Sequence, residues 1–259
     1  MKYPKLSIFL ILILAVVLWV WISGMEGTRS RADLAPVANV PGHGAVLVIG
    51  GTRNTGLEVV RLLRARGDDV VVLVRPASDA TAAEALGARV FRGDALVPAD
   101  LNAALATEPF RAIVSTLGVT STSAPRPDFD GNRNAIDAAR LAGVKRYVLI
   151  TVIGAGDSRD SAPAPARYFL RKVIPEKTKA EDYLKTSGLD YTIIRPGGLL
   201  NGEAEGKAYL TEDTASMSWI RRADLARLMV QALDDPRSID KTYHAFDPDR
   251  TRFWSMFMN

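Results

Sequence analysis

The sequence of 259 residues contains no cysteine and only two histidines, His43 and His244. A chain without cysteine cannot form disulfide bonds, thiolate nucleophiles or zinc sites with sulfur ligands. Two histidines cannot assemble a histidine metal cluster, so we expect no metal site. The redox chemistry of a compartment cannot be inferred from such a sequence, and any catalysis must use hydroxyl, amine, carboxylate or guanidinium groups, or a bound organic cofactor.

Blocks of like charge are also missing. The 33 basic and 29 acidic residues give a net charge of +4, and the basic residues are interleaved with acids along the chain. Proteins that bind nucleic acid usually gather their positive charge on one stripe or segment. We therefore expect no nucleic-acid partner.

Charged residues are absent from Leu6 to Met25, which reads LSIFLILILAVVLWVWISGM. Twenty helical residues at about 1.5 Å each span the roughly 30 Å hydrocarbon core of a bilayer. Trp19 and Trp21 suit the interfacial belt at the end of such a helix. We predict a single-pass membrane anchor within residues 1–25, and hence a membrane location.

A cleavable signal peptide is the alternative interpretation of this segment, because Lys2 and Lys5 form a basic start. The length of the apolar run and the lack of a small-residue cleavage pattern favour the anchor. Arg29 and Arg31 on the other flank balance the first two lysines, so the charges do not set the orientation. Residues 26–44 contain prolines and glycines without periodicity and predict a linker.

Residues 45–259 form the expected folded domain, in which short β-branched runs alternate with helical patterns. The expected strands are 45–49, 70–74, 89–91, 112–114, 147–150 and 191–194, and the expected helices include 56–63, 101–105 and 134–141. Strands buried on both faces and joined by right-handed crossovers give a doubly wound parallel α/β sheet, the Rossmann fold. Ligands bind beyond the carboxyl ends of such strands, so the irregular segments 154–166 and 197–218 are candidate substrate loops.

The turn between the first strand and the first helix reads VIGGTRNTG and stands where a dinucleotide-binding fingerprint is expected. Gly50 permits the tight turn, and Gly56 permits close packing of the helix on the strand. Thr52 and Thr55 can donate hydroxyl hydrogen bonds to phosphate oxygens. Asn54 takes the place of a glycine, since asparagine is a non-glycine residue that tolerates a left-handed backbone.

The coenzyme is predicted from two arginines. Arg53 lies inside the turn, and Arg75 and Ser78 follow the second strand, where NAD-specific sites place an acidic residue for the ribose hydroxyls. A guanidinium is a planar bidentate donor that suits the 2′-phosphate of NADP. The sequence therefore predicts NADP, or NADPH, although either arginine could also be a solvated surface residue.

Seven motifs in order indicate a family. They are VIGGTRNTG, LVRPAS, VFRGDA, AIVSTLG, NAIDAARLAGVKRYVLITVIGAG, EKTKAEDYLKTSGLDYTIIRPGGL and WIRRADLARLMVQAL. With these motifs the chain resembles the extended and atypical short-chain dehydrogenase/reductase superfamily, particularly its NmrA-like and biliverdin-reductase-B-like NAD(P)H-binding branch. The resemblance spans about Ala45 to Phe246.

The resemblance implies further site residues. Asp94 and Ala95 would flank the adenine, and Pro196 would lie near the nicotinamide. The positions that would border the cofactor beyond the fourth strand are Thr116, Leu117 and Gly118. Thr151 and Lys177 fall on the catalytic positions of the family: Thr151 would hydrogen-bond a substrate carbonyl, and Lys177 would bind the nicotinamide ribose.

The chain departs from the family where a proton donor is expected. Counting back from Lys177, the tyrosine of a YxxxK motif would be Val173, which cannot donate a proton. The segment YFLRK supplies the same spacing with Tyr168 and Lys172, but its register is shifted and Pro175 intervenes. Asp224 is expected to cap or brace a late helix rather than to take part in catalysis.

Two functions follow from these observations. The first is an NADPH-dependent oxidoreductase that reduces a flavin, quinone or carbonyl compound with a proton from solvent. The second is a non-catalytic NADPH-binding sensor, or a scaffold with a protein partner in a membrane complex. A sugar-nucleotide epimerase fits less well, because such members generally retain the tyrosine. Since NADPH is cytosolic, the domain is expected to face the cytosol, although an uncleaved anchor could equally export it.

Overall fold

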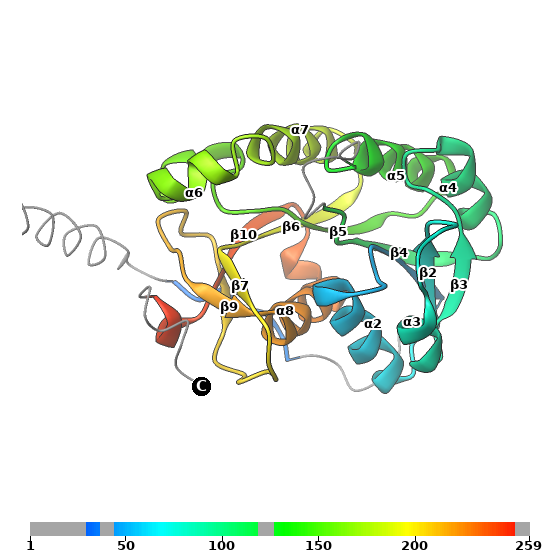
Figure 1. Cartoon of the computed structure of the whole chain (residues 1–259), viewed down its shortest axis with the longest axis horizontal. Coiled ribbons are helices and arrows are strands. Elements are labelled where there is room, and N and C mark those ends of the chain that lie inside the picture. The colour runs from blue at the N-terminus through cyan, green and yellow to red at the C-terminus, as the bar shows by residue number, and fades with distance from the viewer. Residues whose placement is uncertain (1–29, 37–43, 119–126, 252–259) are drawn as a thin grey trace, which may run out of the picture.

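The computed structural model describes residues 30–36, 44–118 and 127–251, shown in colour in Figure 1. Across these three ranges no helix combines the length and the apolar character that a membrane crossing requires. The predicted anchor at residues 6–25 lies outside them.

A sheet of eight strands forms the centre of the described part, in the order β3-β2-β1-β4-β5-β6-β10-β8. All neighbours in this sheet are parallel except β8, which runs antiparallel to β10. The strands are β1 (Ala45–Ile49), β2 (Val70–Val74), β3 (Arg89–Arg92), β4 (Phe110–Ser115), β5 (Arg146–Ile150), β6 (Asp190–Pro196), β8 (Tyr209–Thr211) and β10 (Lys241–Phe246). This order confirms the predicted doubly wound Rossmann fold.

Helices cover both faces of the sheet (Figure 1). On one face lie α2 (Asn54–Arg66), α3 (Thr81–Ala85) and α8 (Arg222–Asp234), and on the other lie α4 (Pro98–Leu105), α5 (Asp130–Leu141) and α7 (Ile174–Lys185). Side chains of β1 alternate between the two cores, with Val46 and Val48 in one and Leu47 and Ile49 in the other. Every residue of β1 is therefore buried, as a parallel central strand requires.

Helix α2 begins and ends close to its predicted limits. Val59, Val60 and Leu63 form its buried face on the sheet. Gly67 ends the helix with φ of 92°, a left-handed conformation that costs glycine little. Its N–H donates to the carbonyl of Arg64 at 3.0 Å. The glycine thus acts as the stop signal expected from the sequence.

The two candidate substrate loops are partly regular. Residues 154–166 include a 3₁₀ helix at Gly156–Ser161 and the start of α6 (Ala164–Phe169). Residues 197–218 include β8 and β7 (Gly198–Leu200), which pairs with β9 (Trp219–Arg221) in a separate small sheet. The sequence did not predict these short elements, because they lack the unbroken β-branched runs that mark β1 and β2.

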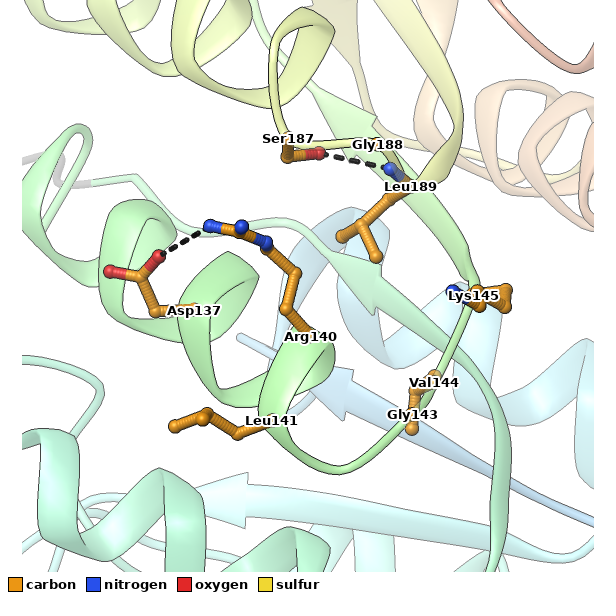
Figure 2. Close-up of a pocket in the computed structure, with 9 residues that line it drawn as sticks. All are labelled: Asp137, Arg140, Leu141, Gly143, Val144, Lys145, Ser187, Gly188 and Leu189. Carbon is orange, nitrogen blue, oxygen red and sulfur yellow. Dashed lines mark hydrogen bonds and ion pairs between the residues drawn. The ribbon is translucent and has the colours of Figure 1, made fainter.

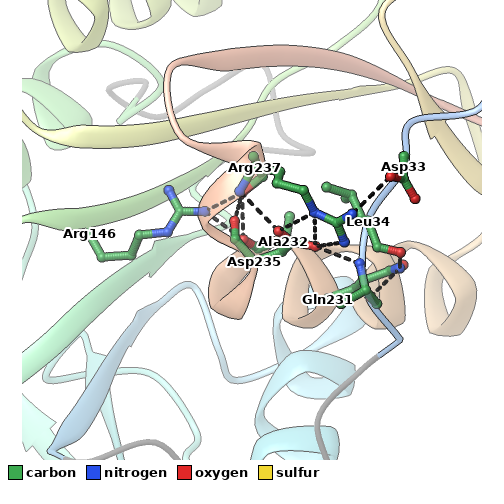
Figure 3. Close-up of polar contacts among 9 residues, drawn as sticks. Asp33, Leu34, Arg146, Gln231, Ala232, Asp235 and Arg237 are labelled. Atoms are coloured by element: carbon green, nitrogen blue, oxygen red, sulfur yellow. Dashed lines mark hydrogen bonds and ion pairs between the residues drawn. The ribbon is translucent and has the colours of Figure 1, made fainter.

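Residues 30–36, here called the strap, lie against the domain although they fall in the segment expected to be a linker (Figure 3). The N–H of Ala32 donates to the carbonyl of Leu210 in β8 at 2.7 Å. The N–H of Ala35 donates to the carboxylate of Asp235, directly after α8. The strap therefore extends the contacts of the edge strand β8 and ties the chain to the end of α8.

Candidate functional site

The turn between β1 and α2 has the backbone that its residues predict. Gly50 has φ of 86° and Asn54 has φ of 52°, so both take left-handed conformations. A Cβ atom on Gly56 would lie 2.2 Å from the carbonyl oxygen of Gly50 and 2.6 Å from Oγ1 of Thr116. Only glycine fits there, which confirms the close approach of helix to strand.

The backbone N–H groups in the turn between β1 and α2 are placed to bind a ligand. The backbone N–H groups of residues 52–55 make no hydrogen bond within the parts of the chain that the structure describes. The first turn of α2 contains no acidic residue, and its N-terminus carries the positive end of the helix dipole. The N–H groups of residues 52–55 can donate to a pyrophosphate, and the first turn of α2 carries no carboxylate that would repel it. The residues present therefore fit a dinucleotide.

The end of β4 lies beside this turn, because β4 pairs with β1 although two strands intervene in the sequence. Thr116 donates its N–H to the carbonyl of Ile49 at 2.9 Å and its hydroxyl to the carbonyl of Gly50 at 3.1 Å. The neighbours β1 and β4 form the topological switch point at which doubly wound sheets bind ligands. Thr116, Leu117 and Gly118 thus begin the loop that follows β4, beside the turn that leads into α2.

Arg53 and Arg75, predicted to select the coenzyme, are both exposed. Neither guanidinium makes a hydrogen bond or ion pair with any residue that the structure describes. Ser78 is half-buried, and its N–H donates to the carbonyl of Arg75 at 2.9 Å. Both guanidinium groups are therefore available to an anion.

Arg92 is a residue of this region that the sequence reasoning missed. It ends β3, the neighbour of β2, and its Nη1 donates to the carbonyl of Ser78 at 2.7 Å and to that of Arg75 at 3.5 Å. Arg92 thus holds the loop that carries Arg75. An arginine at the carboxyl end of the adjacent parallel strand is the signal that could have found it.

Asp94 and Ala95 form the turn after β3. The Asp94 carboxylate accepts a hydrogen bond from the N–H of Leu96 at 2.9 Å. The carbonyl of Ala95 accepts one from the side-chain amide of Asn134 in α5 at 3.0 Å. These bonds fix the loop where the resemblance expects the adenine, and they use one oxygen of Asp94 for the protein itself.

Lys177 is buried in the first half of α7. Its Nζ lies 3.4 Å from Oδ1 of Asp128 and donates to the carbonyl of Leu117. A Cβ atom on Gly118 would stand 3.9 Å from the same nitrogen. The lysine therefore reaches the loop that follows β4. Asp128 was not predicted.

Thr151 lies just beyond β5, and its side chain belongs to a buried charged network. The hydroxyl donates to the Glu181 carboxylate at 2.6 Å. The same carboxylate accepts two hydrogen bonds from Arg195, at 3.0 Å from Nε and 2.6 Å from Nη2. Glu181 and Arg195 are fully buried, and Arg195 also pairs with the more exposed Asp157. Glu181 lies one helical turn from Lys177, so one face of α7 serves both catalytic candidates.

This network shifts several pKa values. Burial alone would lower the pKa of Arg195 and raise that of Asp157, but their hydrogen bonds and charges reverse both shifts. His244 in β10 stands opposite Arg195 in β6. Burial, followed by the nearby Arg195 charge, lowers the His244 pKa, while its Nδ1 lies 2.8 Å from the carbonyl of Ser216. The imidazole is therefore neutral at pH 7.

The structure also describes the residues around Val173, where the family is expected to have its proton-donating tyrosine. Val173 precedes α7 directly. Tyr168 lies in α6 and Lys172 lies in the turn between α6 and α7, so the two do not share a helix face, and both are exposed. The alternative YxxxK placement is therefore wrong as a helical pair. Pro196 ends β6, is buried, and accepts a hydrogen bond from the N–H of Ile153 at 3.0 Å.

Asp224 braces a loop. It is buried in the first turn of α8, and its two carboxylate oxygens accept the N–H groups of Glu205 and Gly206, each at 2.8 Å. The residue that precedes the helix is Arg221, and no side chain caps it. Asp224 thus joins a loop to the first turn of α8, a contact that the sequence did not predict.

A cavity of about 520 Å³ lies away from these residues (Figure 2). It is lined by Asp137, Arg140, Leu141, Gly143, Val144, Lys145, Ser187, Gly188 and Leu189. These residues come from the C-terminal end of α5 and from the segments that lead into β5 and β6. The cavity therefore lies at the amino ends of the strands, opposite the edge where a doubly wound sheet binds its ligand.

Comparison with known proteins gives consistent matches. The profile of a family described as NAD(P)H-binding matches residues 50–236. The chain is 31% identical to an NAD(P)H azoreductase of Xenophilus azovorans, over 78% of this chain and 68% of the relative. It is 29% identical to the uncharacterized sugar epimerase YhfK of Bacillus subtilis, over 79% of this chain and 94% of the relative. Among solved structures, ChuY, an anaerobillin reductase of Escherichia coli O157:H7, is 35% identical with a TM-score of 0.72 and covers 79% of this chain and 98% of its own.

Proposed function

The chain belongs to the NAD(P)H-binding family of atypical short-chain dehydrogenase/reductases, and from this premise we propose that it is an NADPH-dependent oxidoreductase. Its substrate is a small organic molecule of the flavin, quinone or carbonyl class. Two relatives, the azoreductase and the anaerobillin reductase, are named as reductases, which supports this reaction type.

The choice of NADPH over NADH rests on one observation: the guanidinium groups of Arg53 and Arg75 have no partner among residues 30–36, 44–118 and 127–251. The first lies in the phosphate-binding turn and the second follows β2, the strand next to β1. Each can form charge-assisted hydrogen bonds with the 2′-phosphate. No carboxylate follows β2 directly to repel that phosphate, since the sequence there is Arg75, Pro76, Ala77 and Ser78.

The remaining residues of the site would bind the coenzyme and orient it. The N–H groups of residues 52–55 and the hydroxyls of Thr52 and Thr55 would hold the pyrophosphate. Lys177 binds the nicotinamide ribose next to Gly118, and Pro196 borders the nicotinamide. A bound coenzyme would supply the hydride, and solvent would supply the proton that completes the reduction, because Val173 stands where the family has its tyrosine.

Thr151 lines the substrate side of the site in this proposal. Its hydroxyl proton is directed at Glu181, so the oxygen can accept a hydrogen bond while that contact is kept. Donation to a substrate carbonyl requires the hydroxyl to rotate away from Glu181. Thr151 therefore acts as a positioning group rather than as the source of the proton.

The test is NADPH oxidation by the full-length protein in detergent, measured at 340 nm against a panel of flavins, quinones, azo compounds and carbonyl compounds. We expect turnover with at least one class, and a lower kcat/KM for Lys177→Gln than for Lys179→Gln, an exposed lysine of the same helix. Absence of turnover with every class would contradict the reductase assignment.

A non-catalytic NADPH sensor is the second candidate. Among the residues that the structure describes, no tyrosine hydroxyl is hydrogen-bonded to Thr151 or Lys177, which supports a site without its own proton donor. Tight NADPH binding by calorimetry without hydride transfer would favour this function. The missing tyrosine also weighs against an epimerase, despite the name of YhfK.

Residues 1–25 are proposed as a single-pass anchor, residues 26–44 as the connecting segment and residues 45–259 as the catalytic domain, facing the cytosol where NADPH is found. The uncharged stretch of residues 6–25 supports the anchor. Protease accessibility in sealed membrane vesicles tests the orientation: cleavage only from the cytosolic side is expected. Release of the protein from membranes by alkaline carbonate would contradict the anchor.

A further inference from the structure

Helix α6 is unusual in that none of its six residues is buried. Tyr168 is 63% exposed and Phe169 is 78% exposed, and they are two of the four large hydrophobic residues found exposed in the described part of the chain. Their rings stack edge to face with centroids 5.9 Å apart. A short helix gains its stability mainly from packing, and α6 offers its largest apolar side chains to the outside.

Two basic residues follow this aromatic pair closely in the sequence. Arg171 and Lys172 lie in the turn after α6 and are exposed, and the Arg171 guanidinium lies 4.5 Å from the centre of the Tyr168 ring. Neither cation has a carboxylate partner in the parts of the chain that the structure describes, whereas Arg167 pairs with Asp160 at 3.2 Å. The surface formed by Tyr168, Phe169, Arg171 and Lys172 therefore combines apolar rings with unneutralised positive charge. It is called the aromatic–basic surface below.

The place of this surface in the molecule limits what can cover it. Helix α6 and the strap lie toward the same end of the long axis of the molecule (Figure 1). Residue 30, where the strap begins, is five residues after Met25, the end of the predicted anchor. Five residues span at most about 18 Å. An inserted anchor would therefore hold this end of the domain close to the bilayer.

We propose that the aromatic–basic surface binds the headgroup region of an anionic lipid bilayer. Tyrosine and phenylalanine rings partition into the interface between hydrocarbon and water. Arg171 and Lys172 match the negative surface potential of anionic lipids. A second copy of the chain would offer the same positive charges to itself, which makes it the less complementary occupant.

Because the sequence contains no cysteine, a single introduced cysteine can be labelled at one chosen position, which gives a direct test. The full-length protein carrying Phe169→Cys is labelled with an environment-sensitive fluorophore and inserted into lipid nanodiscs. The matched control is Leu141→Cys, because Leu141 is equally exposed at 78% and lies at the end of α5. The discs contain phosphatidylcholine alone or with about 30% phosphatidylglycerol.

We expect the label at position 169 to shift to the blue in the anionic discs and to be quenched by lipids that carry a nitroxide near the headgroup. The label at position 141 should show neither change. In the Phe169→Cys background, the pair Arg171→Glu and Lys172→Glu should remove the dependence on anionic lipid. NADPH titration in the same discs reports on the cofactor site separately, so failure of the proposed function would be recognised as such.

The same spectra overturn the proposal if positions 169 and 141 behave alike in anionic discs. They also overturn it if the label at position 169 becomes shielded in detergent without lipid as protein concentration rises, because a second copy would then be the occupant. An unchanged lipid dependence after the double charge reversal would remove the electrostatic part and contradict the proposal as stated.

Discussion

The hydroxyl of Thr151 donates a 2.6 Å hydrogen bond to the buried carboxylate of Glu181. A residue expected to face the substrate is thereby joined to the ion pair between α7 and β6, in which Arg195 makes two contacts with the same carboxylate. Burying such a pair is costly unless each charge is fully hydrogen-bonded. Thr151 completes that requirement, so its side chain has a structural role beside any role toward substrate.

Thr151→Val should therefore destabilise the protein. The substitution removes one donor from a buried carboxylate, and we expect the free energy of unfolding to fall by about 1–2 kcal/mol. Thr151→Ser keeps the hydroxyl and should retain most of the stability. Urea unfolding followed by circular dichroism measures both. Equal stability of the Val variant and the parent would mean that the hydrogen bond contributes nothing in solution.

Arg92→Ala should weaken discrimination between the coenzymes. Arg92 holds the carbonyls of Ser78 and Arg75, so its loss frees the loop that carries the Arg75 guanidinium. We expect the dissociation constant for NADPH to rise about twofold to tenfold, while that for NADH stays constant. Arg89→Ala is the control, because Arg89 begins the same strand and pairs with Asp69 and Glu108. A similar effect of both variants would contradict a local role for Arg92.

Stability should fall as the pH decreases below about 6.5, in part because of His244. Burial lowers the His244 pKa in the folded state, so the unfolded chain binds the proton more readily. The contribution of His244 is therefore complete above the unfolded pKa and is lost as the pH falls toward the folded one. Thermal unfolding of His244→Gln between pH 7.5 and pH 5 should show a flatter dependence than the parent. An unchanged slope would count against a buried neutral imidazole.

The strap should depend on Asp235 more than on Asp33, although Arg237 contacts both (Figure 3). Asp235 is buried and also accepts the N–H of Ala35, whereas Asp33 is 94% exposed. Hydrogen bonds from Arg237 and then from Ala35 hold the pKa of Asp235 at about 2. This stabilisation is present above the ordinary carboxyl pKa and is lost as the pH falls toward 2.

Asp235→Asn should accordingly lower the free energy of unfolding by about 1–3 kcal/mol, and Asp33→Asn should leave it unchanged within error. Limited proteolysis near residue 30 gives a second readout, since a released strap is cut faster. Equal protease sensitivity of the two variants would contradict the anchoring role of Asp235.

Strands β1 and β2 follow from the sequence because all their residues are buried, whereas no residue of β3, also predicted, is buried. The limits of β1 and β2 are those predicted, since each is an unbroken apolar run. Strand β10 was missed because Lys241 and His244 interrupt its apolar pattern. Its polar residues are accommodated by partners distant in sequence, such as the carbonyl of Ser216 beside His244. The hydrophobic pattern within a short stretch of sequence does not indicate such distant partners.

The residues of the site also divide into those that the sequence predicts and those that it does not. The left-handed Asn54 and the close approach at Gly56 are local backbone properties, and their sequence motif predicts them. Glu181 and Arg195 were missed because their partners come from different elements. A weak signal was present: Glu181 lies four residues after Lys177 on one helix face, and Arg195 stands inside an apolar strand. A charge in such a strand requires a buried partner.

Calorimetric titration of the full-length protein with NADPH and NADH tests the central claim, that Arg53 and Arg75 bind the 2′-phosphate. We expect NADPH to bind at least about tenfold more tightly than NADH. The double variant Arg53→Ala, Arg75→Ala should lose this preference while its affinity for NADH stays the same. Equal affinity of the parent protein for the two coenzymes, or no binding of either, would contradict the account.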